Sequence, residues 1–444
     1  MRIAVVGAGI TGLAAGYEAA KAGADVVVHE AAERAGGRIL TTELAGQLVD
    51  EGPDAFLARV PWAVELCQEL GLDGGLVSPA QRAAFVYSRG GLRAIPQPNV
   101  LGVPLDFDAL AASGIVSAEG VDRARQEPDL AGSPLAGDES VGTLVRRRLG
   151  DEVADRLVDP LIGGINASSI DDLSVKAAVP QLAEAASRGP SLVQELRRLA
   201  ASSTADPSAP VFYTLADGLG RLTDELAGRL GDRLRLSSPV VDLADLEADQ
   251  VIVTLPAPAA GALVAPVSAD AAGLLHSIDY ASVVLVSLAF DAVDVNHPME
   301  GSGYLVPAVE GRTITACSWA SSKWTHIGSA DTVVLRVSAG RFRDERALAM
   351  DDEALLDAVR ADLAATMGLD AEPQAVRISR WEQSLPQFRP GHLELVTDIE
   401  QALAHDAPWL QVTGAWARGL GLPACINQGR QAARTSMTEG AIAR

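Results

Sequence analysis

The sequence predicts a fold of the α/β plus α+β class: a discontinuous Rossmann-type domain, a mostly helical insert and a domain of mixed or antiparallel sheet. Three observations lead to this prediction. A strand, a glycine turn, a helix and a second strand follow one another within residues 2–38. A second strand, glycine loop and helix occupy residues 409–438, and a helix-rich and a strand-rich stretch lie between these two units. The two ends of the chain are therefore expected to share one domain.

The opening segment has the residue pattern of a dinucleotide-binding turn. Apolar residues 3–6 predict a buried strand, and Gly7, Gly9 and Gly12 follow in G-x-G-x-x-G spacing before an alanine-rich helix. Gly7 permits the tight turn, Gly9 lets a pyrophosphate approach the backbone, and Gly12 lets the helix pack close to the strand. The free N–H groups at the start of the helix attract phosphate. This segment therefore predicts a dinucleotide cofactor.

The next strand, residues 26–29, ends at Glu30, where a carboxylate can hold a ribose hydroxyl. Glu30 begins the run E-A-x-x-R-x-G-G-R, which contains a second glycine turn at Gly36 and Gly37 and ends at Arg38. This run resembles the second signature of the flavin amine oxidase superfamily, which includes protoporphyrinogen oxidases and carotenoid desaturases. The resemblance implies that this turn and Arg38 meet the pyrophosphate of FAD from its far side. FAD is therefore favoured over NAD.

Composition and charge restrict the other partners. The chain has 444 residues, enough for two or three domains, and a formal net charge of −22. Such an acidic protein is a poor broad-surface partner for nucleic acid or an anionic membrane. An anionic substrate must therefore be met by a local group of arginines. Lysine is rare, which we attribute to genome composition, and the only lysines are Lys21, Lys176 and Lys323.

The expected location is the cytoplasm. The dinucleotide pattern starts at residue 2, so no secretory signal is expected, and no apolar run reaches the ~20 residues of a spanning helix. The three scattered cysteines suit a reducing compartment, and neither they nor the histidines show metal-ligand spacing, so no metal is expected; the cysteines are Cys67, Cys317 and Cys425.

The periodicity of the chain predicts three domains. Residues 1–85, 205–275 and 395–444 are expected to form the FAD-binding domain, residues 86–204 the helical domain and residues 276–394 the substrate-binding sheet domain, with a linker at residues 201–210. Helices are expected at 61–70, 140–149, 217–230, 354–367 and 425–438, and strands at 235–241, 250–254, 280–290, 332–338, 375–381 and 409–413. Ser140 is expected to cap its helix, and the arginines at 146–148 to form a solvated face.

Segments along nearly the whole chain resemble the protoporphyrinogen/coproporphyrinogen oxidase family. The segments that carry the resemblance are GPDAFLARVPWAVELCQELGL (52–72), PLIGGINASSIDDLS (160–174), YTLADGLGRL, GSGYLVP with SWASSKW, WEQSLPQFRPGH (381–392) and GLGLPACINQG near the C-terminus. The chain departs from the family pattern at Asn166, Val60 and Ala424. These departures concern the substrate pocket more than the cofactor.

The resemblance implies FAD- and O2-dependent, six-electron oxidation of a porphyrinogen to a porphyrin in haem biosynthesis, with release of H2O2. It implies non-covalent FAD, and a substrate site that includes Arg59, as a partner for substrate carboxylates, and Ile165. We name no acid–base residue. The residues expected to contact FAD are Gly7, Ala8, Gly9, Ile10, Thr11, Gly12, Glu30, Ala31, Gly37, Arg38, Gly52, Pro53, Asp54, Ala55, Val240, Trp381, Gly414, Leu422, Pro423 and Ala424.

Coproporphyrinogen III is the favoured substrate, because it is the more polar porphyrinogen and no membrane anchor is evident. Protoporphyrinogen IX is the first alternative. A flavin amine oxidase is the second, although Trp416 supplies only half of the aromatic cage that such enzymes use. A carotenoid-type desaturase is less favoured, and a non-catalytic flavin-binding or haem-delivery partner is a further alternative. Weak peripheral membrane contact, contact with downstream haem-pathway enzymes and the oligomeric state are left open.

Overall fold

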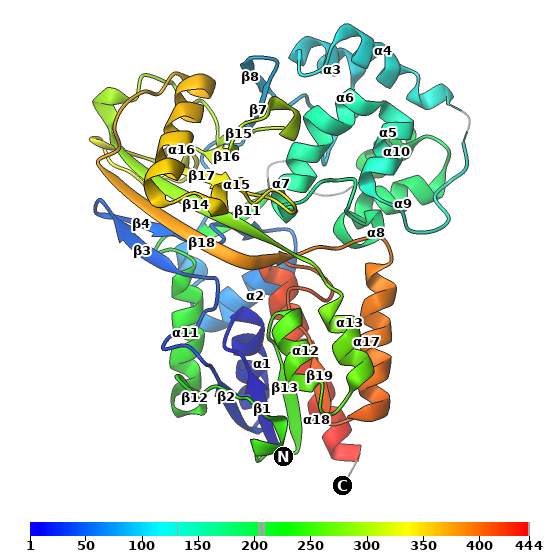
Figure 1. The fold of residues 1–444 in the computed structure, drawn as a ribbon, viewed down its shortest axis with the longest axis vertical. Helices are drawn as coiled ribbons and strands as arrows, with labels where there is room; N and C mark the ends of the chain where they lie inside the picture. Colours follow the sequence, from blue (N-terminus) through cyan, green and yellow to red (C-terminus); the bar gives the residue numbers. More distant parts are fainter. Residues whose placement is uncertain (131, 203–205, 207–208, 443–444) are drawn as a thin grey trace.

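The computed structural model describes residues 1–130, 132–202, 206 and 209–442. A parallel sheet with its helices forms one half of the molecule, and a larger, mostly antiparallel sheet lies beside a helical region in the other half (Figure 1). The predicted linker at 201–210 falls largely outside the described residues.

The parallel sheet draws its strands from distant parts of the chain, which confirms the discontinuous Rossmann-type prediction. All neighbouring strands pair in parallel. Their order is β12 (Leu234–Arg235), β2 (Asp25–His29), β1 (Arg2–Val6), β13 (Gln250–Val253) and β19 (Leu410–Val412). The strand predicted at 235–241 is wrong beyond Arg235, because the chain leaves the sheet there.

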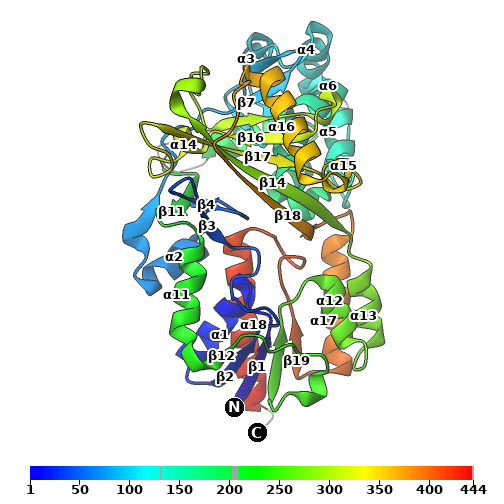
Figure 2. The same ribbon diagram turned by 60° about the vertical axis from the view of Figure 1, so that its left-hand side comes forward.

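Alternating side chains of β1 supply the cores on the two faces of this sheet. Ile3 and Val5 join the core beneath α1 (Ile10–Lys21), α2 (Pro61–Leu70), α11 (Gly220–Leu230) and α18 (Leu422–Ile442). Ala4 and Val6 join the core beneath α12 (Ala257–Val264), α13 (Ala269–His276) and α17 (His392–Asp406). Figure 2 shows these two helix layers on opposite sides of the sheet.

The second sheet is mostly antiparallel, as predicted, and contains seven strands in the described part of the chain. Among these strands only β15 and β7 pair in parallel. Its order is β18 (Ala375–Pro386), β14 (Tyr280–Asp291), β17 (Thr332–Ala339), β16 (Ile314–Ser318), β15 (Gly303–Leu305), β7 (Phe85–Ser88) and β8 (Gly91–Ala94). Helix α16 (Asp352–Met367) shares a hydrophobic core with it. Leu44 and Val49 of the hairpin β3 (Thr41–Leu44) and β4 (Gln47–Asp50) pack with Ala289 and Val334 of this sheet.

The helical region follows β8 and has its own apolar core. Its elements are α3 (Phe107–Ser113), α4 (Ala118–Arg125), α5 (Val141–Leu149), α6 (Asp151–Val153), the π-helix η3 (Ala154–Gly163), α7 (Gly164–Asn166), α8 (Val175–Ala178), α9 (Pro180–Arg188) and α10 (Leu192–Ser202). The predicted cap of α5 is confirmed, since the Ser140 hydroxyl accepts a hydrogen bond from Thr143 N at 3.0 Å. Within the described part of the chain, no helix is both long and apolar enough to cross a bilayer.

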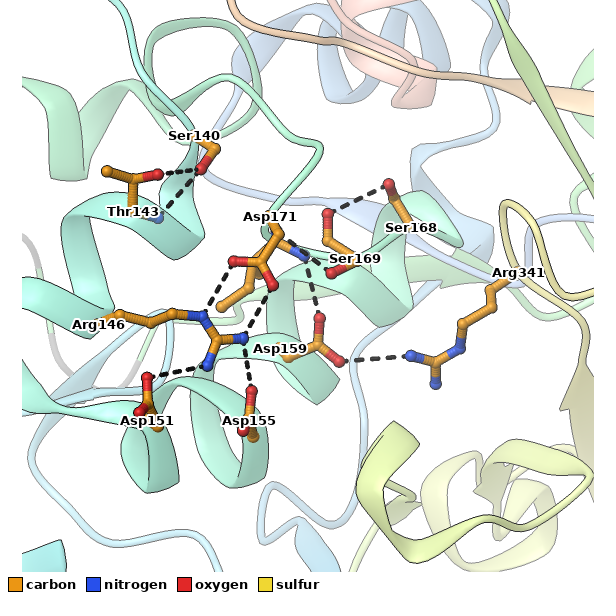
Figure 3. A network of polar contacts seen from close by, with 11 residues as sticks. Ser140, Thr143, Arg146, Asp151, Asp155, Asp159, Ser168, Ser169, Asp171 and Arg341 are labelled. Carbon is orange, nitrogen blue, oxygen red and sulfur yellow. Dashed lines mark hydrogen bonds and ion pairs between the residues drawn. The ribbon is translucent and has the colours of Figure 1, made fainter.

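The solvated face predicted at residues 146–148 is confirmed for Arg147, which is exposed, but is wrong for its two neighbours. Arg148 is buried, and the guanidinium of Arg146 binds the carboxylates of Asp151, Asp155 and Asp171 (Figure 3). The acids come from helices and loops that follow α5, so helical periodicity within α5 alone gave no sign of them.

Candidate functional site

The turn between β1 and α1 is shaped for close approach of a ligand to the backbone. Gly7 has φ of +99°, and its N–H donates to His29 O at 2.8 Å. A Cβ on Gly12 would lie 1.9 Å from Gly7 O, so only glycine lets the helix sit this close. At Gly9 an added Cβ would meet nothing within 4 Å, so the backbone there faces open space. This arrangement fits the roles predicted for the three glycines.

Glu30 fixes the end of β2 against this turn. Its carboxylate accepts hydrogen bonds from Ala8 N at 2.7 Å and from Ala32 N at 2.9 Å. Both bonds hold the side chain in one orientation at the carboxyl end of the parallel sheet. The N–H of Ser238 donates to Glu30 O at 2.8 Å. Val240 follows two positions later in the chain. The crossover from β12 therefore runs beside the predicted ribose partner.

The second glycine turn lies directly alongside the first. Gly36 N donates to Ala8 O at 2.8 Å, and a Cβ on Gly37 would lie 3.2 Å from Gly9 Cα. Arg34 holds this turn by donating to the carbonyls of Gly37 and Ile39. The structure thus brings together two glycine motifs that helix α1 and strand β2 separate in the sequence.

The surroundings of Arg38 suit an anionic ligand. Its Nη2 donates to Gln383 O at 2.7 Å, and it forms no ion pair with any carboxylate among the described residues. Burial lowers the pKa of Arg38 from its usual value, although Tyr280 and Cys425 oppose this effect. A desolvated guanidinium without a counter-charge, beside backbone that is open at Gly9, fits a pyrophosphate. The residues present therefore fit FAD.

The segment 51–55 runs between the two sheets, and side chains from the half of the molecule with the antiparallel sheet hold it in place. Arg336 of β17 donates from Nη2 to Gly52 O and lies 3.4 Å from Asp54 Oδ1 through Nη1. Lys323 Nζ lies 3.0 Å from Asp54 Oδ2. Trp381 of β18 donates from its indole nitrogen to Glu51 O at 2.6 Å. The segment predicted to lie along the flavin is therefore fixed by three side chains of the other half of the molecule.

Charges along this segment shift one another's pKa. Burial raises the pKa of Asp54, but Lys323 and Arg336 outweigh it and hold this pKa well below its usual range. Asp50, at the end of β4, has no such ion pair. Burial raises its pKa to about 6, although it accepts hydrogen bonds from Thr41 Oγ1 at 2.5 Å and Leu219 N at 3.0 Å.

The C-terminal glycine loop joins the same site. Gly414 has φ of +156° and leads to Trp416, whose indole nitrogen donates to Leu255 O at 3.3 Å. Helix α18 then begins at Leu422, with Pro423 and Ala424 in its first turn. A Cβ on Gly429 would lie 2.0 Å from Thr11 O, so α18 contacts the start of α1 closely. The start of α1 therefore packs against α18, the helix whose first turn carries the predicted FAD contacts Leu422, Pro423 and Ala424.

Cys425 is a buried packing residue. Burial raises the pKa of its thiol to about 11, and its Sγ lies 3.5 Å from Leu420 O. A protonated, enclosed thiol is a poor nucleophile, which agrees with the expectation of non-covalent FAD.

The two predicted substrate residues are exposed and lie on different elements. Arg59 lies in the turn between β5 (Phe56–Leu57) and α2 and has no hydrogen bond or ion pair to any described residue. Ile165 lies in α7 and is 61% exposed. An unpaired arginine suits a ligand carboxylate, and an exposed apolar side chain suits an apolar part of the same ligand.

Sequence reasoning missed Lys323, Arg336 and His392. The signal for Arg336 was present, because it is the one charged residue in the otherwise apolar or small strand TVVLRVSA. Lys323 is one of three lysines in the chain, a rarity attributed above to composition alone. His392 Nε2 lies 2.7 Å from Trp416 O and its ring stacks on Phe388, so it supports the C-terminal loop.

Comparison with known proteins gives concordant results. The family model described as flavin containing amine oxidoreductase matches residues 10–435. The coproporphyrinogen III oxidase of Bacillus subtilis is 31% identical over 461 residues, covering 98% of this chain and 98% of its own. The coproporphyrinogen III oxidase of Mycobacterium bovis is 33% identical, covering 98% of this chain and 97% of its own.

A crystal structure from Exiguobacterium sp. 255-15, provisionally named a protoporphyrinogen oxidase, superposes with a TM-score of 0.89. It is 30% identical and the match covers 99% of both chains. The similarity therefore includes the helical region and both sheets.

Proposed function

The chain belongs to the flavin-containing amine oxidoreductase family, and we propose that within this family it oxidises coproporphyrinogen III to coproporphyrin III, using FAD and O2. The observation that carries the proposal is the end-to-end match, over 98% of both chains, to a protein named for this activity. The match is not confined to the glycine motifs, which many FAD and NAD enzymes share. It extends through the segments where a substrate must bind.

In this proposal Gly9 exposes the backbone to the pyrophosphate of FAD, Arg38 neutralises part of its charge and Glu30 holds the ribose. Further proposed FAD contacts are the segment 52–55, Trp381 and the start of α18. FAD, when bound at these residues, would supply two-electron oxidation with O2 as the final acceptor and one H2O2 for each electron pair. Removal of six electrons from one porphyrinogen therefore takes three rounds.

The protein's own contribution is to position and enclose the substrate. Lys323, Arg336 and Trp381 hold the segment 51–54, so that this segment keeps its position when the macrocycle binds. Arg59 is the proposed partner of a peripheral carboxylate, and Ile165 the proposed apolar contact. No side chain is assigned a proton-transfer role, because the ring nitrogens of a porphyrinogen can release their own protons.

The proposed setting is the cytoplasm. The three cysteines are free and buried, which suits a reducing compartment. The products would pass to the enzymes that follow in haem biosynthesis. Domain limits of 1–85, 205–275 and 395–444 for the FAD-binding domain, with 86–204 and 276–394 for the other two, remain part of the proposal.

Protoporphyrinogen IX is the second candidate substrate, favoured by the name of the Exiguobacterium structure. A rate comparison on both porphyrinogens, with putrescine as an amine control, tests the choice. We expect kcat/KM for coproporphyrinogen III to exceed that for protoporphyrinogen IX by about tenfold or more, since the former offers two more carboxylates. Arg59→Met is expected to reduce this preference. A preference for protoporphyrinogen IX, or turnover of putrescine alone, would reverse the assignment.

A further inference from the structure

In the turn that carries Ile165, this one side chain is exposed, and the neighbouring residues are held in place. The turn follows the π-helix η3 and ends at Ala167, whose φ of +46° is a left-handed value uncommon for a residue with a side chain. Ile165 is 61% exposed, whereas Ile162 and Asn166 are buried. Single-turn π-helical irregularities are frequent at functional sites, and strained backbone persists only where the surroundings hold it in place.

The surroundings that hold this turn belong to the seven-stranded sheet. Phe342, in the loop after β17, donates from its backbone nitrogen to Ala167 O at 2.7 Å. Gln387, directly after β18, donates from Nε2 to Asn166 O at 3.2 Å. Next to Phe342, Arg341 Nη1 lies 3.3 Å from a carboxylate oxygen of the π-helix. The residues that follow two strands of the sheet, β17 and β18, therefore hold the turn in place.

The carboxylate is that of Asp159, which bridges the turn and the sheet. Its Oδ1 accepts from Ile170 N at 3.0 Å, and its Oδ2 faces Arg341 (Figure 3). Burial raises the pKa of Asp159, while the Ile170 N–H and Arg341 lower it. Both partners of the Asp159–Arg341 pair are nearly enclosed, with side-chain exposures of 8% and 15%. Loss of the arginine would leave a buried carboxylate without its cation, which is costly.

The neighbouring Arg146 cluster does not connect the turn to the sheet. Its three carboxylates all belong to the helical region, so it ties that region to itself. Figure 3 shows Asp159 between this cluster and Arg341. Among the ion pairs drawn in Figure 3, Asp159–Arg341 is the one that joins the helical region to the loop after β17.

We infer that Arg341 and Asp159 are positioning residues that set where Ile165 stands against the bound macrocycle, and so determine how tightly a porphyrin or porphyrinogen binds. This inference rests on the proposed function, because it takes the ligand to be a tetrapyrrole macrocycle with peripheral carboxylates. Neither residue touches the ligand. Both act through the turn that carries Ile165.

The test compares Arg341→Met, Ile165→Ala and the double variant in the FAD-loaded protein, with coproporphyrin III as the probe. The matched control is Arg343→Met, which breaks the exposed pair between Arg343 and Asp172 at 3.4 Å, two residues away. Porphyrin affinity is followed by fluorescence quenching, Tm by thermal unfolding, and KM and kcat with coproporphyrinogen III.

We expect Arg341→Met to raise Kd and KM about tenfold with little change in kcat, the loss expected when one well-buried apolar contact is misplaced. Ile165→Ala should do the same, and the double variant should lose no more than either single variant. Arg341→Lys, which keeps the charge, should recover part of the affinity, and Arg343→Met should behave as wild type.

Other results would overturn the inference. These are a Kd for Arg341→Met equal to that of wild type, even with a lower Tm, or losses that add fully in the double variant. If Arg341→Met does not fold, Arg341→Lys and Asp159→Asn give the same comparison with Ile165→Ala. Failure of the proposed function is distinguishable, because wild type itself would then neither bind coproporphyrin III nor oxidise coproporphyrinogen III, and the inference would fall with it.

Discussion

Asp50 and Asp54 lie four positions apart in the chain and have opposite pKa shifts for a simple reason. Asp54 has two cations, Lys323 and Arg336, within 3.4 Å, whereas Asp50 has hydrogen-bond donors but no paired cation. In a buried site the counter-charge decides which form of a carboxyl is favoured. The sequence places both acids beside the predicted flavin-facing segment, but it cannot say which one meets the cations.

The raised pKa of Asp50 predicts a pH dependence of stability. With a folded pKa of about 6 against an ordinary 3.8, folded Asp50 keeps a proton that the unfolded chain has released. The free energy of unfolding contributed by this residue therefore falls as pH rises from about 4 to 6. The free energy of unfolding of wild type should fall by roughly 2–3 kcal/mol across this pH window because of Asp50, and Asp50→Asn should lack this fall.

Urea unfolding at pH 4.5, 5.5 and 7 measures this effect. Asp224→Asn, at an exposed position on α11, is the matched control and should leave the pH profile unchanged. Identical profiles for Asp50→Asn and wild type would show that Asp50 titrates near its ordinary value. Asp54, whose pKa is lowered, loses its stabilising charge only at more acidic pH and does not interfere.

At the scale of elements, the site depends on α1 and α18 being in close contact. Gly429 allows this contact, because a Cβ on it would lie 2.0 Å from Thr11 O in α1. Gly12 allows a different one, the packing of α1 against the turn at Gly7, because a Cβ on Gly12 would lie 1.9 Å from Gly7 O. The glycine motif around Gly12 was readable from the sequence, since its spacing is characteristic. Gly429 was not, because nothing local to α18 requires a glycine there. A glycine is needed at position 429 because α1 packs against it in the folded structure, although α1 lies more than 400 positions earlier in the chain.

Gly429→Ala should therefore push α18 away from α1. We expect it to lower stability by about 1–3 kcal/mol through overpacking and to weaken retention of FAD. The matched control is Gly228→Ala on α11, where a Cβ would meet nothing within 4 Å and stability should rise by up to about 1 kcal/mol. Thermal unfolding and the flavin content after gel filtration give both readouts. Equal behaviour of the two variants would mean that α18 can shift without consequence.

At the scale of the whole molecule, the carboxyl ends of the parallel strands face the antiparallel sheet, and segment 51–54 joins the two. The two sheets and the order of the nucleotide motifs could be predicted, because each rests on local periodicity and glycine spacing. The cations that fix the segment could not, since Lys323 and Arg336 lie some 270 positions or more from Asp54 and reach it only through sheet pairing. The pairing of Arg341 with Asp159 could not be predicted either, because the two residues lie 182 positions apart.

The central claim is that this site removes six electrons from coproporphyrinogen III and passes them to O2. The most direct test measures H2O2 and coproporphyrin III formed together by the FAD-loaded protein, with a heat-denatured blank to subtract spontaneous oxidation. The account predicts three H2O2 for each coproporphyrin III, because each round transfers two electrons. Porphyrin formation no faster than in the blank, or porphyrin formed without H2O2, would contradict it.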